Sequence, residues 1–194
     1  MIIAIPVKPF DVAKRRLSGL LSDVQRRQIS VELARRTANA AVLAGARPLI
    51  LSADDGVTKW AGRHGFEVLL DEGSSLNEAA RSAADHAGDE PWIVCHADLP
   101  LLQASDLRAA IKVMVDGRWV VSASSDGGTS LIGGYGPFRF SFGPGSFHRH
   151  LAALSHRNVG IVSRLGTMLD LDTPADLEAA INHPRGSWLA SIVG

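Results

Sequence analysis

The sequence predicts an α/β fold in which a mostly parallel sheet is covered by helices on both faces. Short apolar runs typical of buried strands alternate with helical segments almost throughout the chain. The 194 residues, 46% of them hydrophobic and 21% charged, are enough to bury a core of ordinary size. No internal repeat, low-complexity segment or linker divides the chain, so we expect residues 1–194 to form a single domain.

The first half of the chain shows the alternation most clearly. Strands are expected at Ile2–Val7, Pro48–Ala53, Phe66–Leu70 and Trp92–Ala97. Helices are expected from Ser22 to Gly45 and at Gly56–His64, Leu76–Ala87 and Asp106–Val115. Ser22 and Gln25 form a capping box, and Ser105 is expected to cap the fourth helix. The apolar face of the first helix is expected to carry Ile29, Leu33, Thr37 and Val42.

The pattern changes in the second half. Glycines within Thr129–Tyr135 and the alternation of Phe138–Phe142 predict a short antiparallel insertion. Further strands are expected at Trp119–Ser124, Val159–Ser163 and Met168–Leu171, and a helix at Ser146–His156. Thr173, Pro174 and Asp176 are typical of a helix start, because they supply a cap, a first-turn proline and an acid. Residues 186–194 carry no clear signal.

Charge and composition exclude several classes of protein. The formal net charge is zero and the pI is near 7.1, so no basic footprint for nucleic acid or an anionic membrane is present. No apolar run is long enough to span a bilayer, and the N-terminus lacks the basic leader of a signal peptide. The single cysteine, Cys95, excludes an intrachain disulfide and favours a cytoplasmic protein. Because Cys95 lies in an apolar run, we expect it to be a small buried hydrophobe.

Two acidic clusters carry the main functional signal. Asp98 follows the fourth strand, and Asp170 and Asp172 follow an apolar segment near the C-terminus. In an open α/β sheet, ligands bind at the carboxyl ends of the strands, where carboxylates are suited to a hard divalent cation. Taken singly, each acid is more often structural than a metal ligand: Asp98 suits a cap of a turn or helix, and Asp172 suits the helix N-terminus that follows it, whereas Asp170 has no such role. Taken together, they favour a metal site beside a phosphate-rich substrate.

Cations and glycines supply further candidates. Lys8, Lys14 and Arg16 follow the first strand and suit a polyphosphate, although a solvated basic loop explains them equally well. Gly127–Ser130 and Phe142–Phe147 are loops whose glycines would let backbone amides approach an anion, or ordinary turns.

Three polar side chains leave alternatives open. Asn77 near a helix start suits either a base or ribose contact or a cap. His148 and His150 flank Arg149, and we expect them at the surface or behind other site residues rather than as metal ligands, because no third histidine is close.

Several of these motifs occur in one order and together resemble a known family. They are Lys8 with Ala13–Leu17, Leu76-Asn77-x-Ala79, Ala97–Pro100, Gly128-Thr129, Phe142-Gly143-Pro144-x-Ser146-x-x-x-His150 and Asp170-Leu171-Asp172-Thr173-Pro174-x-Asp176-Leu177, where x is any residue. The chain is similar, over about nine-tenths of its length, to the 2-phospho-L-lactate / phosphoenolpyruvate guanylyltransferases of deazaflavin coenzyme F-420 biosynthesis.

The resemblance implies a fold, an activity and a set of site residues. The fold would be the three-layer, Rossmann-like nucleotide-diphospho-sugar transferase (GT-A) type. The substrates would be GTP and a small phosphorylated three-carbon acid (phosphoenolpyruvate, 2-phospho-L-lactate or 3-phosphoglycerate), with Mg²⁺ as cofactor and pyrophosphate as product. The implied residues are Asp98, Asp170 and Asp172 for the metal, Thr129, Gly143 and Ser146 for the acid, Lys8, Lys14 and Arg16 for the triphosphate, and Asn77 for the nucleoside.

The resemblance also implies a setting. Lys14, Arg16 and Asp98 would carry the catalysis, in a cytoplasmic monomer or homodimer with no nucleic-acid or membrane partner. The stretch Ala123–Ser130 departs from the family pattern, because an Asp-Arg pair is missing and a glycine replaces the first threonine of a Gly-Thr-Gly-Thr loop. The acceptor therefore stays open. The alternatives are a nucleotidyltransferase for a sugar phosphate or a molybdopterin, and a non-catalytic nucleotide-binding homologue.

Overall fold

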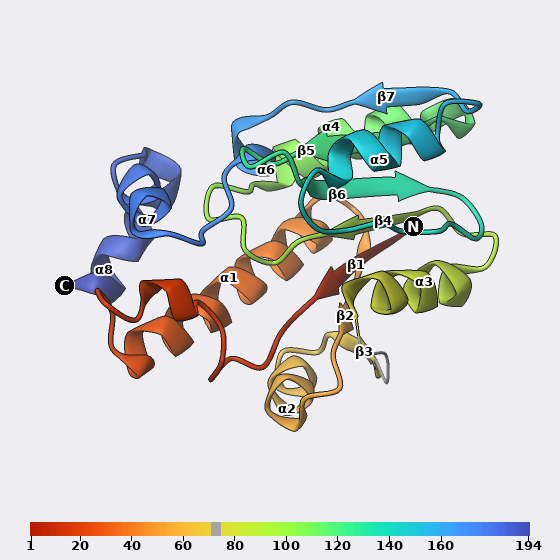
Figure 1. Cartoon of the computed structure of the whole chain (residues 1–194). Coiled ribbons are helices and arrows are strands. Elements are labelled where there is room, and N and C mark those ends of the chain that lie inside the picture. The colour runs from red at the N-terminus through yellow and green to blue at the C-terminus, as the bar shows by residue number, and fades with distance from the viewer. Residues whose placement is uncertain (71–74) are drawn as a thin grey trace.

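The computed structural model describes residues 1–70 and 75–194. Within these residues, seven strands form one sheet in the order β3-β2-β1-β4-β6-β5-β7 (Figure 1). The strands are β1 (Ile2–Pro6), β2 (Arg47–Leu51), β3 (Glu67–Leu69), β4 (Trp92–Cys95), β5 (Trp119–Ala123), β6 (Thr129–Gly134) and β7 (Val159–Ile161). Every pairing is parallel except the two that β6 makes with β4 and β5. The predicted mostly parallel sheet is confirmed.

Helices cover both faces of the sheet. One face carries α1 (Asp23–Leu43), α2 (Asp55–Arg63) and α4 (Ala104–Met114), and the other carries α3 (Leu76–Ala87) and α5 (Ser146–Ala153). Side chains alternate across a strand, so in β1 Ile3 and Ile5 join the first core while Ile2 and Ala4 join the second. Burial on both faces explains why these strands consist of unbroken apolar runs.

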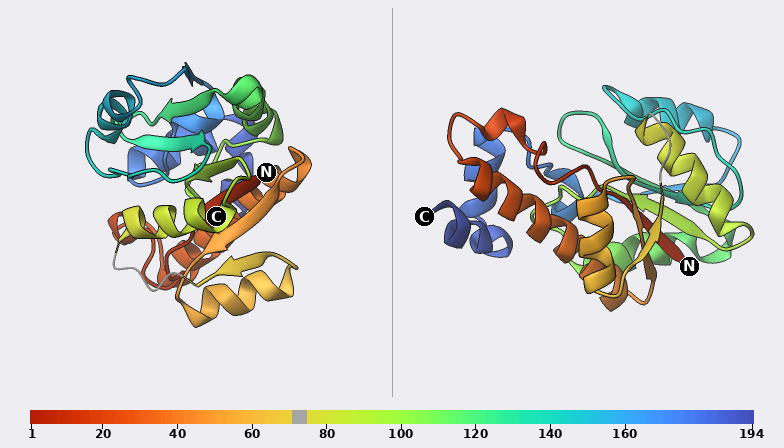
Figure 2. Two further views of the ribbon diagram at one scale, coloured as in Figure 1. Left: turned by 90° about the vertical axis from the view of Figure 1, so that its right-hand side faces the viewer. Right: turned by 90° about the horizontal axis from the view of Figure 1, so that it is seen from below.

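A third cluster of apolar residues joins the two ends of the chain. Leu17 and Leu33 from the N-terminal region pack with Leu171, Leu177 and Leu189 from the C-terminal region. The elements concerned are η1 (Arg15–Leu17), α7 (Pro174–Ile181), η3 (Pro184–Leu189) and α8 (Ala190–Val193), which stand beside the start of α1 (Figure 2). This packing brings the loop that carries Lys14 next to the loop that carries Asp170 and Asp172. The tail that showed no sequence signal thus forms two short helices.

Several helix boundaries agree with the sequence. The Ser22–Gln25 capping box begins α1, and Thr173 caps α7 with Pro174 in its first turn. Cys95 is fully buried, as expected. Among the described residues, no helix is both long and apolar enough to cross a membrane.

Two expectations about helices are wrong. Ser105 does not cap α4, because the helix begins at Ala104, two residues before the expected start, and Gln103 is the N-cap, with its backbone amide bonded to Asp106 Oδ2 at 3.0 Å. Val42 is 51% exposed instead of lying on the buried face of α1, since it follows Thr37 by five residues and falls off the helical stripe; Ala41 is buried there.

Three expectations about strands also need correction. Thr129–Gly134 is antiparallel to its neighbours, as expected, but it forms β6 in the interior of the sheet and is not part of an insertion. The Phe138–Phe142 segment is not a strand, because its aromatic rings pack against Trp92 and Trp119 while the backbone pairs with no strand among the described residues. The Met168–Leu171 segment is not a strand either: α6 (Leu165–Met168) ends there and a loop follows.

Candidate active site

A pocket of about 900 Å³ opens at the carboxyl ends of the parallel strands. Its wall is drawn from the N-terminal loop, the ends of β2 and β4, the turn before β6, the loop before α5 and the loop before α7. Nine of the ten residues predicted for the site line it: Lys8, Lys14, Arg16, Asp98, Thr129, Gly143, Ser146, Asp170 and Asp172. The structure thus brings together side chains that lie more than 160 positions apart in the sequence.

The tenth predicted residue, Asn77, lies behind the wall. Its neighbours Ser75 and Leu76 line the pocket, while the Asn77 Oδ1 accepts a hydrogen bond from the Phe142 backbone amide at 2.6 Å. In the structure Asn77 joins α3 to the loop before α5, and its predicted contact with a nucleoside stays a prediction.

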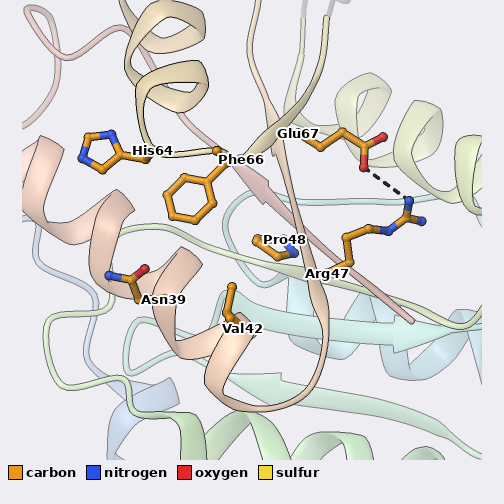
Figure 3. A pocket seen from close by; sticks show the side chains of 8 residues that line it. Asn39, Val42, Arg47, Pro48, His64, Phe66 and Glu67 are labelled. Carbon is orange, nitrogen blue, oxygen red and sulfur yellow. Dashed lines mark hydrogen bonds and ion pairs between the residues drawn. The ribbon is translucent and has the colours of Figure 1, made fainter.

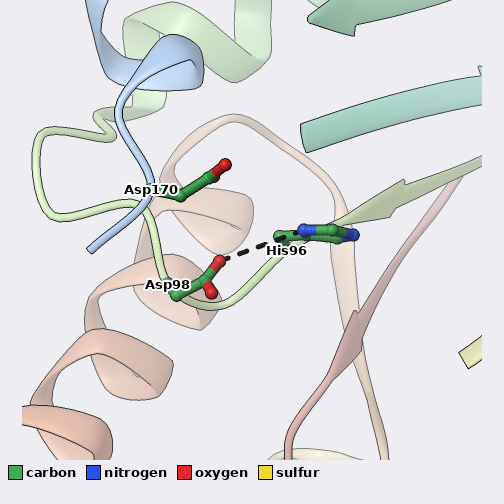
Figure 4. Close-up of side chains that lie close together, drawn as sticks. All are labelled: His96, Asp98 and Asp170. Atoms are coloured by element: carbon green, nitrogen blue, oxygen red, sulfur yellow. Dashed lines mark ion pairs between the residues drawn. The ribbon is translucent and has the colours of Figure 1, made fainter. Parts of the chain in front are cut away.

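Asp98 and Asp170 converge with a histidine at one edge of the pocket. One ligand atom from each of His96, Asp98 and Asp170 lies within 4.8 Å of the others. His96 Nδ1 lies 4.0 Å from Asp98 Oδ1, and Asp170 lies close by (Figure 4). Asp98 Oδ1, Asp170 Oδ1 and His96 Nε2 are buried and have no hydrogen-bond partner among the described residues. Buried polar atoms of this kind are rare in folded proteins unless a ligand or ion completes them.

Backbone contacts explain how remote stretches meet. The Leu171 amide donates to the Asp98 carbonyl oxygen at 2.9 Å, and the Leu171 side chain is fully buried. The buried Asp106 carboxylate accepts hydrogen bonds from Arg164 and Arg185, each at 3.1 Å, and these arginines flank the loop that carries the acids. The C-terminal loop is therefore held against the end of β4 from both sides.

Lys14 links the same acids from the N-terminal loop. Its Nζ lies 3.3 Å from Asp98 Oδ2 and 3.3 Å from Asp172 Oδ1, and its side chain is only 8% exposed. Burial by itself would lower the pKa of Lys14, but the two carboxylates outweigh burial and raise it. Lys14 is therefore a charged ammonium that is held at the acidic cluster.

The carboxyl groups respond in opposite ways to this environment. Burial on its own would raise the pKa of Asp98, yet the nearby Lys14 ammonium reverses the effect and holds that pKa at about 2. For Asp170, burial and then repulsion by Asp98 raise the pKa to about 8. Two close carboxyl groups without a cation between them cannot both ionise easily. A divalent cation would hold both in the ionised form.

The donor set fits a hard divalent cation. Two carboxylates with orphaned oxygens suit Mg²⁺ or Mn²⁺, and the imidazole of His96 suits the softer of the two. Not all of the residues predicted for the metal lie together. Asp98 and Asp170 converge, whereas Asp172 is half exposed and reaches the cluster through Lys14.

A second group of polar residues also lines the pocket. Ser146 Oγ is 3.1 Å from Thr129 Oγ1, which is 2.9 Å from His150 Nδ1. Gly143 has a positive φ (+120°), and none of the described residues accepts a hydrogen bond from its amide. Thr129, Ser146 and Gly143 therefore offer two hydroxyls and an amide as candidate donors to an anion in the pocket.

Another hollow of about 480 Å³ lies at the other end of the sheet (Figure 3). It is lined by α1 residues such as Asn39, by Phe66 and by the Arg47–Glu67 ion pair, at the amino ends of β2 and β3. Parallel sheets bind their ligands at the carboxyl ends, so this hollow carries no part of the candidate site.

Sequence reasoning missed His96 but agrees with the positions of His148 and His150. His96 precedes Asp98 by two positions at the end of β4, and this spacing in an extended chain puts both side chains on one side. His148 is exposed at the surface, and His150 is fully buried behind Thr129, so each takes one of the two expected positions. His150 follows Ser146 by four residues on a helix, and such pairs share a face.

Comparison with known proteins agrees with the arrangement of the site. A family model described as "Guanylyl transferase CofC like" matches residues 1–190. The chain belongs to the CofC-like guanylyl transferase family. It is 36% identical over 183 residues to the phosphoenolpyruvate guanylyltransferase of Rubrobacter xylanophilus, with 89% of each chain covered. It is 28% identical over 193 residues to the 2-phospho-L-lactate guanylyltransferase of Methanocaldococcus fervens, covering 97% of this chain and 88% of that one.

Solved structures support the predicted fold of this CofC-like protein. A crystal structure named for a nucleotide-diphospho-sugar transferase of Desulfovibrio desulfuricans superposes with a TM-score of 0.79 at 15% identity, covering 99% and 96% of the two chains. A nucleotidyl transferase of Methanothermobacter gives 0.63 at 14% identity, covering 98% and 99%. Likenesses at such identities show the fold alone, and the predicted nucleotide-diphospho-sugar transferase type is confirmed. Membership of the family makes the chain a nucleotidyltransferase enzyme.

Proposed function

We propose that the protein moves the guanylyl group of GTP onto a small phosphorylated three-carbon acid, such as phosphoenolpyruvate or 2-phospho-L-lactate, and releases pyrophosphate. Two relatives that match this chain over most of their length are named as guanylyltransferases of these two acids. The proposal includes Mg²⁺ as the cation and a place in the cytoplasmic synthesis of the deazaflavin coenzyme.

One observation supports this reaction above others. Asp98 and Asp170, each with a buried, partnerless oxygen, and the Lys14 ammonium line the same pocket as the hydroxyls of Thr129 and Ser146. An acidic cation site with a lysine suits a nucleoside triphosphate. Neutral donors in the same pocket suit a small anion. The two substrates would therefore meet in this pocket.

The reaction is a displacement at phosphorus. A phosphate oxygen of the acid attacks the α-phosphorus of GTP, the new P–O bond forms, and the bond to the β-phosphate oxygen breaks with loss of pyrophosphate. A phosphate is already a nucleophile at neutral pH, so the protein need not supply a base. Catalysis then depends on positioning the two substrates and on compensating negative charge.

The chain's own residues divide this work. Lys14 would stabilise the charge that develops on the leaving pyrophosphate, and the exposed Lys8 and Arg16 would attract the triphosphate to the pocket. Asp98 and Asp170 would hold the cation, with Asp172 close by through Lys14. A bound divalent cation would polarise the phosphoryl oxygens and neutralise their charge.

The acid would bind at Thr129, Gly143 and Ser146. The Gly143 amide and the hydroxyls of Thr129 and Ser146 are donors, and donors at a helix start suit a carboxylate or phosphate. The α5 helix begins at Ser146, so its N-terminus lies at this part of the pocket. Because the family's Asp-Arg pair before Gly127 is missing, the identity of the acid stays open.

The test is a panel of nucleotides and acids assayed for pyrophosphate. Each of GTP, ATP, CTP and UTP is combined with phosphoenolpyruvate, 2-phospho-L-lactate or 3-phosphoglycerate in the presence of Mg²⁺. We expect pyrophosphate release with GTP and one of the acids, and a guanylylated acid by mass spectrometry. Release with a sugar phosphate in place of these acids would show another acceptor, and GTP binding without release would show a binding homologue.

A further inference from the structure

Thr129, Ser146 and His150 form a hydrogen-bonded chain that runs from the protein interior to the pocket. His150 is fully buried, and each hydroxyl residue is 1% exposed. Both ring nitrogens have partners: Nδ1 is 2.9 Å from Thr129 Oγ1, and Nε2 is 2.9 Å from the Ser141 backbone nitrogen. Only the hydroxyl end of this chain lines the pocket.

The partners decide where the imidazole carries its proton. A backbone amide can only donate, so the Ser141 N–H donates to Nε2, which must be bare. The neutral ring then carries its hydrogen on Nδ1 and donates it to Thr129 Oγ1. Burial, followed by the charge of Arg149, lowers the pKa of His150 to about 4, in agreement with a neutral ring at neutral pH.

Counting hydrogens shows what this tautomer does for the pocket. The chain holds three hydrogens, one on Nδ1 and one on each hydroxyl, and it contains two hydrogen bonds, one to each side of Thr129 Oγ1. One hydroxyl hydrogen is therefore left over. With the opposite tautomer, Thr129 would donate to Nδ1 and Ser146 would donate to Thr129, so that no hydrogen would remain for a ligand.

We propose that His150 is a positioning residue that makes the Thr129–Ser146 pair a hydrogen-bond donor to an oxyanion of the acceptor acid. The identity of that substrate rests on the proposed function. The spare hydroxyl hydrogen and the Gly143 amide are both donors, so the subsite selects a deprotonated carboxylate or phosphate oxygen.

Two substitutions separate the two contacts of the ring. In His150→Asn, the side-chain nitrogen lies two bonds from Cβ, as Nδ1 does, so it can donate to Thr129 but does not reach Ser141. In His150→Gln, the side-chain oxygen lies three bonds from Cβ, as Nε2 does, so it can accept from Ser141 and leaves Thr129 without its donor. His148→Asn, at an exposed position on the same helix, is the matched control.

We expect the substitutions to change the KM for the acid and to leave the KM for GTP unchanged. His150→Gln leaves one hydroxyl hydrogen spare but no longer fixes it through the donor to Thr129 Oγ1, so it should raise the KM for the acid by up to about tenfold, the scale of a weakened hydrogen bond to a charged group, with the KM for GTP unchanged. His150→Asn should stay within about threefold of the wild type, because it keeps the donor to Thr129. If His150 serves only to hold the loop through Ser141, the order of the two variants reverses, and the proposal is overturned.

A second measurement needs no activity. Nitrogen-15 NMR of the histidine rings distinguishes protonated from bare ring nitrogens, and we expect His150 in the wild-type protein to be protonated at Nδ1 and bare at Nε2 at pH 7. A ring protonated at Nε2 would overturn the proposal even if neither variant folds. If the wild type transfers no guanylyl group to any acid, the proposed function fails, while the ring measurement still decides the tautomer.

Discussion

Replacing Asp98 by asparagine tests the cation site directly. The change keeps the shape of the side chain and removes its charge. Asp98 Oδ2 lies 3.3 Å from the Lys14 ammonium, and Oδ1 faces Asp170 and His96. Two unit charges at this separation interact by about 5 kcal/mol at an effective dielectric constant near 20. Asp172 remains to hold Lys14, so we expect a loss of about 3–4 kcal/mol of transition-state stabilisation, the scale of one lost preorganised contact.

This loss corresponds to a decrease of about 10²–10³-fold in kcat. The assay is pyrophosphate release at saturating GTP, acid and Mg²⁺. Asp89→Asn, an exposed acid before the amino end of β4, is the matched control and should keep wild-type turnover. A folded Asp98→Asn protein, judged by its thermal melt, that turns over within about threefold of the wild type would refute the reasoning.

Three predictions concern stability. Asp106→Ala removes a buried carboxylate but leaves two half-exposed arginines that water can solvate, so we expect a loss of about 2 kcal/mol and a Tm lower by about 4–8 °C. Asp85→Ala, an exposed acid on α3, should leave the Tm unchanged. Gly134→Ala places a Cβ inside the Trp119 ring, so we expect at least about 3 kcal/mol of destabilisation or insoluble protein; a wild-type Tm would contradict this contact. The folded-state pKa of His150, about 4, is lower than the ordinary 6.5, so the unfolded chain binds more protons between these values. Urea unfolding should therefore show a contribution from His150 of at most about 3 kcal/mol to the stability lost as the pH drops from about 6.5 to 4, and His150→Phe should show a smaller dependence on pH than the wild type.

The sequence predicts the parallel part of the fold well because local and long-range preferences agree there. β1 is apolar throughout and buried on both faces, and the Ser22 capping box starts α1 at the predicted residue. Disagreement arises where aromatic packing replaces backbone pairing. Phe138–Phe142 alternates like a strand, yet its rings satisfy their burial by stacking beside Trp92 and Trp119. Periodicity records which side chains are buried, not which backbone bonds are made.

The candidate site was predictable in its members but not in its geometry. The positions of Asp98 and Asp170 after apolar segments indicate that both lie near ligand-binding loops. Their convergence depends on contacts that no local pattern contains, such as the bond from the Leu171 amide to the Asp98 carbonyl. The same is true of His150, since its burial follows from the partners it finds in β6 and in the loop before α5.

The backbone conformation at Lys14 is one that the contacts of the candidate site explain and that local preference does not. Lys14 has φ +57° and ψ +35°, a left-handed conformation that costs a residue with a Cβ about 1 kcal/mol. Glycine would adopt this conformation freely, so the position is occupied by lysine despite a backbone cost. The ion pairs of the Lys14 ammonium with Asp98 and Asp172 offset this cost. The turn of the chain at Lys14 directs the ammonium toward these two carboxylates. Backbone strain therefore coincides with the one buried cation among the predicted site residues that the structure describes, as expected where charge placement is selected over local stability.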